Sequence, residues 1–243
     1  MFKDIHCHLL PGIDDGSKTI EESVETIRRA EKEGITEIVL TPHYIENTRY
    51  NCNNKNKKEL FEKLKNALDE AGINVKLYLG NENYISNNFI DLMTRKEIMT
   101  INNSRYMLFE FPLNQIYQNS KEILYELVTI GCVPILAHPE RYTEFQKNPK
   151  LAEEYASMGI LLQGNYKSLF GKYGRTAKKT LKIFLKKGLI SFMGSDIHRL
   201  DDYNIEKARK KVKKIVKDEK IVDDLFCNNF DKVIRDEEFN INR

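Results

Sequence analysis

Short apolar segments alternate with amphipathic segments along nearly the whole chain, and this alternation limits the possible folds more than any other feature. Apolar runs typical of buried strands, partly β-branched or aromatic, occupy residues 2–6, 36–41, 75–80, 105–111, 133–137, 160–164 and 190–194. Helical patterns lie between them at 20–34, 55–71, 87–96, 120–130, 149–158 and 176–187, and a basic helix at 205–217, followed by a shorter one, closes the chain. Consecutive strand–helix units of this kind favour an α/β fold with a closed parallel barrel over an open sheet.

Composition places the chain among ordinary globular proteins. Of its 243 residues, 41% are hydrophobic and 31% are charged, so we expect one domain, residues 1–243, with a full-sized core. The net charge of +3 predicts no nucleic-acid partner. No apolar run approaches the ~18 residues of a membrane helix, and the N-terminus lacks the apolar stretch of a signal peptide. We therefore expect a cytoplasmic protein with no membrane insertion.

The cysteines and the lysine-rich run each have a structural explanation. The four cysteines form no CxxC pair and fit reduced thiols of a cytoplasmic protein. Cys7 lies between two candidate metal ligands, but strand alternation turns it to the opposite face. The run 207–214 is typical either of a nucleic-acid contact or of a solvated amphipathic helix, and we favour the helix. Its inward positions are Ala208, Val212, Ile215 and Val216.

All five histidines stand at or just after the end of a predicted strand: His6, His8, His43, His138 and His198. Strand ends converge in α/β folds, so residues far apart in sequence meet there. His6 and His8 have i, i+2 spacing on a strand and point the same way, which suits a metal clamp or a polar pair inside a barrel. Several imidazoles with nearby carboxylates favour a metal site.

Four carboxylates accompany these histidines: Asp15, Glu82, Glu110 and Asp196. Asp15 precedes Gly16 and fits a turn former, a ligand or both. Glu82 and Glu110 follow or interrupt apolar strands, where a carboxylate needs a metal or a salt bridge to be buried. Nine such ligands are too many for one ion and suit roughly two or three ions that share a bridging carboxylate. Three divalent ions would leave a charge of about +2, which attracts a phosphate dianion.

The motifs that carry these residues resemble those of a known superfamily. They are DIHCHLLPGIDDGS at residues 4–17, TPH ending at His43, GNE ending at Glu82, LFEF around Glu110, AHPERY at 137–142 and GSDIH ending at His198. In this order they resemble the polymerase-and-histidinol-phosphatase (PHP) superfamily. Within it they are similar to the bacterial manganese-dependent protein tyrosine phosphatases of capsule and exopolysaccharide operons, and the match covers nearly the whole chain.

The resemblance implies a distorted (β/α)7 TIM-like barrel of the PHP fold that holds three metals. The implied cofactor is Mn²⁺, although a mixture of imidazoles and carboxylates also admits Fe or Zn. One ion would bind His6, His8, Glu82 and Asp196. A second would bind Asp15, His43 and His198. The third would bind Glu110 and His138, with Glu82 as the bridge.

The resemblance also implies a substrate and a reaction. The substrate would be phosphotyrosine on the tail of a cognate membrane tyrosine autokinase that controls polysaccharide synthesis. A metal-activated hydroxide would attack phosphorus in line, without a cysteine nucleophile, while Arg141 contacts the phosphate and stabilises the transition-state charge. A second phosphate-binding arginine is expected a few residues after His198, where this chain has Tyr203 instead. Arg199 is then the candidate for a second substrate contact. Asn83 also departs from the apolar residue that more usually follows the glutamate.

Three alternatives have different consequences. A histidinol-phosphate phosphatase-like enzyme would prefer a small phosphomonoester to a phosphotyrosyl peptide. A nuclease-like phosphodiesterase would need a nucleic-acid module, for which the chain shows no sign. A non-catalytic binding protein would hold the phosphorylated tail without releasing phosphate, and the presence of candidates for all nine ligands argues against it.

Overall fold

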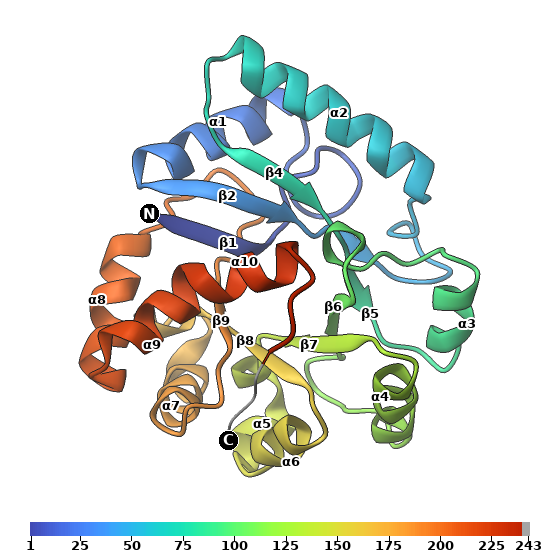
Figure 1. The fold of residues 1–243 in the computed structure, drawn as a ribbon, viewed down its shortest axis with the longest axis vertical. Coiled ribbons are helices and arrows are strands. Elements are labelled where there is room, and N and C mark those ends of the chain that lie inside the picture. Colours follow the sequence, from blue (N-terminus) through green and yellow to red (C-terminus); the bar gives the residue numbers. More distant parts are fainter. Residues whose placement is uncertain (240–243) are drawn as a thin grey trace.

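The strands form two parallel sheets that together make one ring in the computed structural model, which describes residues 1–239 (Figure 1). The first sheet has the order β1 (Phe2–Cys7), β2 (Ile35–Leu40) and β4 (Lys76–Leu79). The second has the order β3 (His43–Tyr44), β5 (Glu82–Tyr84), β6 (Tyr106–Glu110), β7 (Val133–Ala137), β8 (Leu161–Asn165) and β9 (Phe192–Gly194). Every pairing is parallel.

Two of the predicted strands, 36–41 and 75–80, are each followed after a break by a second short strand that was not predicted. After β2 the chain breaks at Pro42 and resumes as β3, and after β4 it breaks at Gly80 and resumes as β5. Proline has no N–H to continue a sheet ladder, and at Gly80 a Cβ would lie 3.2 Å from the backbone of Ile101. The ring closes where Cys7 bridges Ile197 beyond β9. The predicted parallel barrel of the α/β class is confirmed in this distorted form.

Helices surround the ring, and the last of them lies across one end of it (Figure 1). They are α1 (Ile20–Lys32), α2 (Asn54–Glu70), α3 (Phe89–Thr94), α4 (Ser120–Thr129), α5 (Thr143–Lys147), α6 (Leu151–Ser157), α7 (Gly174–Lys186), α8 (Ile205–Val216), α9 (Glu219–Asp223) and α10 (Asn229–Ile234). The short helix α5 was not predicted, because five residues are too few to show a helical period. No helix among residues 1–239 is long and apolar enough to cross a membrane.

The inside of the barrel is closed at one end and polar at the other. Phe230 and Val233 of α10 join the apolar cluster that fills the ring, which includes Ile5, Leu108 and Ile135. A larger core lies between the strands and the surrounding helices. Because the C-terminal segment covers the end at which the strands begin, the opposite end, where the strands finish, is left for the polar side chains.

Candidate metal centre

The carboxyl ends of the strands position all nine candidate ligands. His6 lies near the end of β1 and His8 directly follows it, His43 begins β3, Glu82 begins β5 and Glu110 ends β6. The others lie in the loops after strands β1, β7 and β9: Asp15, His138, Asp196 and His198. A bulge contributes to this placement, because Asp4 pairs with Ile38 but Cys7 pairs with Leu40, which leaves one extra residue in β1. Such an extra residue re-aims the side chains that follow it.

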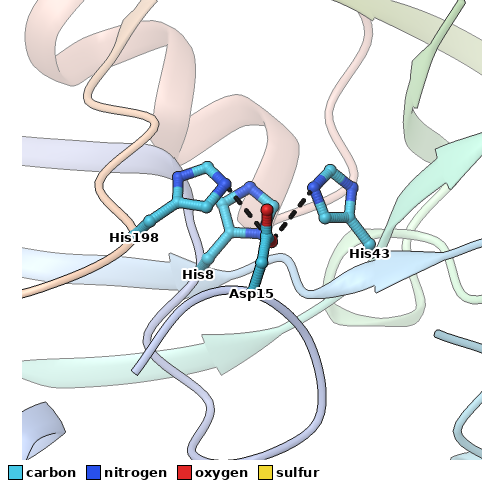
Figure 2. Close-up of side chains that lie close together, drawn as sticks. All are labelled: His8, Asp15, His43 and His198. Atoms are coloured by element: carbon cyan, nitrogen blue, oxygen red, sulfur yellow. Dashed lines mark ion pairs between the residues drawn. The ribbon is translucent and has the colours of Figure 1, made fainter. Parts of the chain in front are cut away.

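The nine side chains form four overlapping clusters whose nitrogen and oxygen atoms lie within 4.8 Å of one another. The most open cluster is His8, Asp15, His43 and His198, and its side chains point at one another in Figure 2. The deeper clusters are His6, His8 and Asp196; His6, Glu82 and His138; and His43, Glu82 and Glu110. The nine predicted ligands therefore meet at one place, but His6, His8 and His43 each also join a cluster outside the set that the resemblance implied for them.

His6 and His8 are held with lone pairs facing each other. Gln163 donates from Nε2 to the carbonyl oxygen of Gly164, so its Oε1 accepts from Nδ1 of His6 at 2.7 Å. Asp14 accepts from Nδ1 of His8 at 2.8 Å. A neutral imidazole with its proton on Nδ1 has a bare lone pair on Nε2. The two Nε2 atoms lie only 3.1 Å apart, an arrangement that a bound cation stabilises and that two lone pairs alone do not.

Glu82 lies at the middle of the clusters. Its Oε2 is 3.3 Å from His6 Nε2, 3.2 Å from His8 Nε2 and 3.1 Å from His43 Nδ1. Its Oε1 is 3.0 Å from His138 Nε2. Ligand atoms bonded to one ion at about 2.1 Å lie roughly 3.0–3.4 Å apart, so these spacings fit metal coordination, with Glu82 able to bridge two ions.

Several of the same atoms have no hydrogen-bond partner within the described part of the chain. They include Asp15 Oδ1, His43 Nδ1 and Glu82 Oε2. Buried polar atoms without partners are costly. A cation in the cluster of His43, Glu82 and Glu110 would satisfy His43 Nδ1 and Glu82 Oε2, and one in the cluster that contains Asp15 would satisfy its Oδ1, so the donor set fits a metal centre.

The pKa values of the ligand side chains show that carboxylate charge dominates the inner part of the centre. Burial favours the neutral form of Glu82, but the neighbouring imidazoles hold its pKa well below the usual range. Burial and His8 lower the pKa of His43, yet the carboxylates of Glu82 and Glu110 outweigh them and raise it to about 9. At the rim, burial and then the charge of His8 lower the pKa of His198 to about 4. The inner pocket therefore attracts cations, and protons compete with metal for it.

Backbone geometry at the ligands is unusual. His138 has φ 35° and Asp196 has φ 51°, both in the left-handed region that non-glycine residues rarely adopt. Such strain persists where surrounding structure fixes it, often at functional sites. Gly16 is required for a different reason, because a Cβ there would lie 1.9 Å from the carbonyl oxygen of His8.

Arg141 lies at the mouth of the centre in a fixed orientation. Its Nη1 is 2.7 Å from Asp196 Oδ2, and its guanidinium lies 4.3 Å from the ring centroid of Tyr173. Asn165 donates to the same oxygen of Asp196 at 2.9 Å. The other oxygen, Oδ1, faces His6 and His8 at 3.7 and 3.5 Å. Asp196 thus connects the arginine to the ligand cluster.

A cavity of about 320 Å³ opens beside these residues. Arg141, Tyr173, Asp196, His198 and Arg199 line it, together with Lys172 and Asp201. Arg199 is exposed at this rim. Tyr203, which stands where a second arginine was expected, is fully buried in the core. Of the two residues, Arg199 is therefore the one that reaches the cavity.

The sequence reasoning missed the residues that hold the ligands. Asp14 was overlooked beside Asp15, although it accepts from His8 Nδ1 and from the backbone N–H of His43 at 3.0 Å. Gln163 and Asn165 lie in the buried strand β8. The signal that drew attention to Glu110, a polar residue in an apolar strand, was present for Gln163 as well.

Fold and site together define a parallel-barrel protein with a candidate multi-metal centre at the carboxyl ends of its strands. The chain belongs to the CpsB/CapC family of capsular polysaccharide synthesis, whose sequence pattern matches residues 2–235. The family resemblance read from the motifs is thereby confirmed.

Individual relatives agree with this assignment. CapC of Staphylococcus aureus is 38% identical over 197 residues, 81% of this chain and 77% of that protein. The tyrosine-protein phosphatase YwqE of Bacillus subtilis is 31% identical over 201 residues, 83% of this chain and 79% of YwqE. The tyrosine-protein phosphatase CpsB of Streptococcus pneumoniae is 29% identical over 247 residues, 96% of this chain and 98% of CpsB.

Solved structures show the same fold. A structure from work on YwqE and CpsB, described as unique metal-dependent tyrosine phosphatases, has a TM-score of 0.91 and 27% identity, and covers 98% of this chain and 96% of that one. Histidinol phosphate phosphatase of Lactococcus lactis has a TM-score of 0.59 at 19% identity, over 88% of this chain and 93% of that one. At that identity the likeness is one of fold.

Proposed function

We propose that the protein is a metal-dependent protein-tyrosine phosphatase. Its substrate would be phosphotyrosine on the tail of a cognate membrane tyrosine autokinase, and its role would lie in capsular or exopolysaccharide synthesis. The observation that carries the proposal is the convergence of nine imidazoles and carboxylates beside one fixed arginine. Membership of the CpsB/CapC family, with relatives named tyrosine-protein phosphatases, supports the choice of substrate.

The charge of the centre suits a phosphate dianion. Four ligand carboxylates stand against roughly two or three divalent ions, with Mn²⁺ the proposed cofactor, which gives a charge between about 0 and +2. When bound, such ions polarise phosphoryl oxygens and activate water. The residues of the chain hold these positions rigidly: Gln163 and Asp14 fix the imidazoles of His6 and His8, and outer partners of this kind also raise ligand basicity.

The positive charge of Arg141 would stabilise the negative charge on the phosphoryl group during its transfer. Its contacts with Asp196 and Tyr173 fix the plane of the guanidinium before a substrate arrives. Preorganised donors stabilise charge in a transition state without reorganisation. Arg199, on the rim of the same cavity, is proposed as a second contact to the substrate.

The leaving group needs little help. Tyrosinate has a parent pKa near ~10 and leaves more readily than an alkoxide.

The buried cysteines offer no nucleophile, because burial raises the pKa of Cys7 well above its usual value and that of Cys132 to about 12. The reaction is therefore proposed to proceed without a covalent cysteine intermediate.

Phosphate release from a phosphotyrosyl peptide, with and without Mn²⁺, tests the proposal. Wild type should require the metal, His138→Ala should lose most activity, and Arg141→Ala should lose about 10²–10³-fold in kcat. Lys63→Ala, an exposed change on α2, is the matched control and should behave as wild type. Equal release by wild type, His138→Ala and Arg141→Ala would overturn the site. Faster turnover of histidinol phosphate than of the peptide would overturn the substrate class.

A further inference from the structure

Helix α8 carries basic side chains on two faces that differ in their partners. On one face each has an acid within ion-pair distance: Arg209, Lys210 and Lys213. On the other face stand residues with i, i+4, i+7 spacing: Lys207, Lys211 and Lys214. Lys207 donates to the amide oxygen of Asn204, and Lys211 and Lys214 have no ion pair with any residue among 1–239. The lysine run therefore has one internally neutralised face and one face with free positive charge.

A second helix faces this unneutralised charge with more lysines. Lys178 and Lys182 lie one turn apart on α7, which packs beside α8 (Figure 1). With Lys211 and Lys214 they line a hollow of about 190 Å³ floored by Leu169 and Ile215. We call this hollow the basic groove. No acidic residue lines it, so a bound anion is the partner that would neutralise its four lysines.

The basic groove is connected to the mouth of the metal centre. Lys211 Nζ lies 5.2 Å from the ring centroid of Phe170, and this ring is 39% exposed. Phe170 and Lys207 line a second hollow of about 340 Å³, whose wall also includes Lys172 and Asp201. Those last two residues line the cavity that holds Arg141 and Arg199 as well. The second hollow thus shares walls with the cavity at the mouth, and the contact between Lys211 and Phe170 places the basic groove next to that second hollow.

We propose that the basic groove docks an acidic segment of the substrate polypeptide, a few residues away in sequence from its phosphotyrosine. This inference rests on the proposed function and adds a determinant of specificity outside the metal centre. The face from Lys207 to Lys214 extends ~10 Å along the helix, the length of about three residues of extended chain. Carboxylate side chains would neutralise the lysines, while Leu169, Ile215 and Phe170 contact the apolar parts of the segment.

This arrangement of hollows favours a polypeptide over other polyanions. An anionic membrane presents a broad flat surface, which cannot enter hollows that lead to a catalytic mouth. A nucleic acid would be expected to meet a larger basic surface than the one that remains after neutralisation on the other face of α8. The segment that carries the phosphotyrosine, by contrast, must leave the mouth along some route. The hollow next to the mouth contains Asp201 and Asp202 as well as lysines, so the unneutralised positive charge that matches an acidic segment lies in the basic groove.

The test compares two phosphotyrosyl peptides, each extended on both sides of the phosphotyrosine, one with glutamates and one with glutamines at the flanking positions. Wild type with Mn²⁺ should show a kcat/KM about fivefold or more higher for the glutamate peptide at low salt, with the difference lost at high salt. Lys182→Gln/Lys211→Gln should abolish the preference mainly through KM. Its turnover of p-nitrophenyl phosphate, which is too small to reach the groove, should equal that of wild type.

Two controls separate the possible failures. Lys58→Gln/Lys63→Gln removes the same charge from exposed positions on α2 and should keep the peptide preference. Fluorescence anisotropy with a non-hydrolysable phosphonate version of each peptide measures docking without turnover, so it still tests the groove if phosphotyrosine is not hydrolysed. Equal affinity of wild type and Lys182→Gln/Lys211→Gln for the glutamate peptide would overturn the proposal. Loss of binding to phosphatidylserine vesicles or to single-stranded DNA, with unchanged peptide affinity, would overturn it in favour of those partners.

Discussion

Asp14 is expected to control metal affinity although it lies outside the ligand clusters. Its Oδ2 accepts from His8 Nδ1 at 2.8 Å and from the backbone N–H of His43 at 3.0 Å. Its Oδ1 accepts from the backbone N–H of Gly16 at 2.9 Å. One buried carboxylate thereby orients one ligand imidazole, places the backbone of a second and closes the loop after β1.

Asp14→Asn keeps the shape of the side chain but removes one of these acceptors. If the amide oxygen faces His8 and His43, the amide NH₂ meets the N–H of Gly16, and a donor opposes a donor. Losing a charged hydrogen bond of this kind costs about 1.5–3 kcal/mol. If that cost falls on the metal-loaded state, the metal dissociation constant rises by about 10- to 100-fold, the usual range for outer-shell partners.

Calorimetric titration of metal-free protein with Mn²⁺ measures this change directly. Asp14→Asn should bind more weakly by the stated factor, and its phosphatase activity should recover at saturating Mn²⁺. Asp91→Asn, which removes an exposed carboxylate paired with Arg95 at 2.9 Å, is the control and should bind like wild type. Unchanged Mn²⁺ affinity in Asp14→Asn, or activity that stays low when metal is saturating, would refute the reasoning.

Three further changes have defined outcomes. Burial lowers the pKa of Lys57 to about 8, so the folded protein loses this proton before the unfolded chain does, at about 10.5. Wild type should therefore gain about 3 kcal/mol in unfolding free energy relative to Lys57→Met between pH 7 and pH 10.5, measured by urea denaturation; a constant difference between the two proteins would contradict this. Iodoacetamide should leave activity unchanged, because Cys7 and Cys132 are buried with raised pKa values and the half-buried Cys52 and Cys227 belong to none of the ligand clusters. Inactivation without metal loss, checked by mass spectrometry and metal content, would oppose this prediction. Gly194→Ala places a Cβ 2.6 Å from Gln163 Nε2 and should lower the free energy of unfolding by about 1–3 kcal/mol, which thermal denaturation would record as a lower melting temperature. An unchanged melting temperature would argue against this contact.

The sequence was sufficient for the barrel and for the membership of the site. Short apolar runs separated by helical patterns predict parallel strand–helix units, and the carboxyl ends of such strands meet on one face. His6, Glu110 and Asp196 could be assigned to one site for this reason, even though they lie far apart along the chain. Each is a polar residue at the end of an apolar run, which is a local signal.

The grouping of the ligands depends on features with no local signal. The extra residue in β1 and the left-handed backbone at His138 and Asp196 decide which atoms meet, and both result from tertiary packing. Asp14 was overlooked because a DDG turn explains both aspartates equally well. The basic groove depends on the packing of α7 against α8, which places lysines from separate helices around one hollow.

The central claim is that metal ions among the nine strand-end ligands enable hydrolysis of phosphotyrosine. Stepwise addition of Mn²⁺ to metal-free protein, with phosphate release from a phosphotyrosyl peptide measured at each step, tests it most directly. Activity should be absent without metal, rise after the first equivalent and saturate at roughly two to three equivalents per chain. Full activity in the metal-free protein, or saturation below one equivalent, would contradict the account.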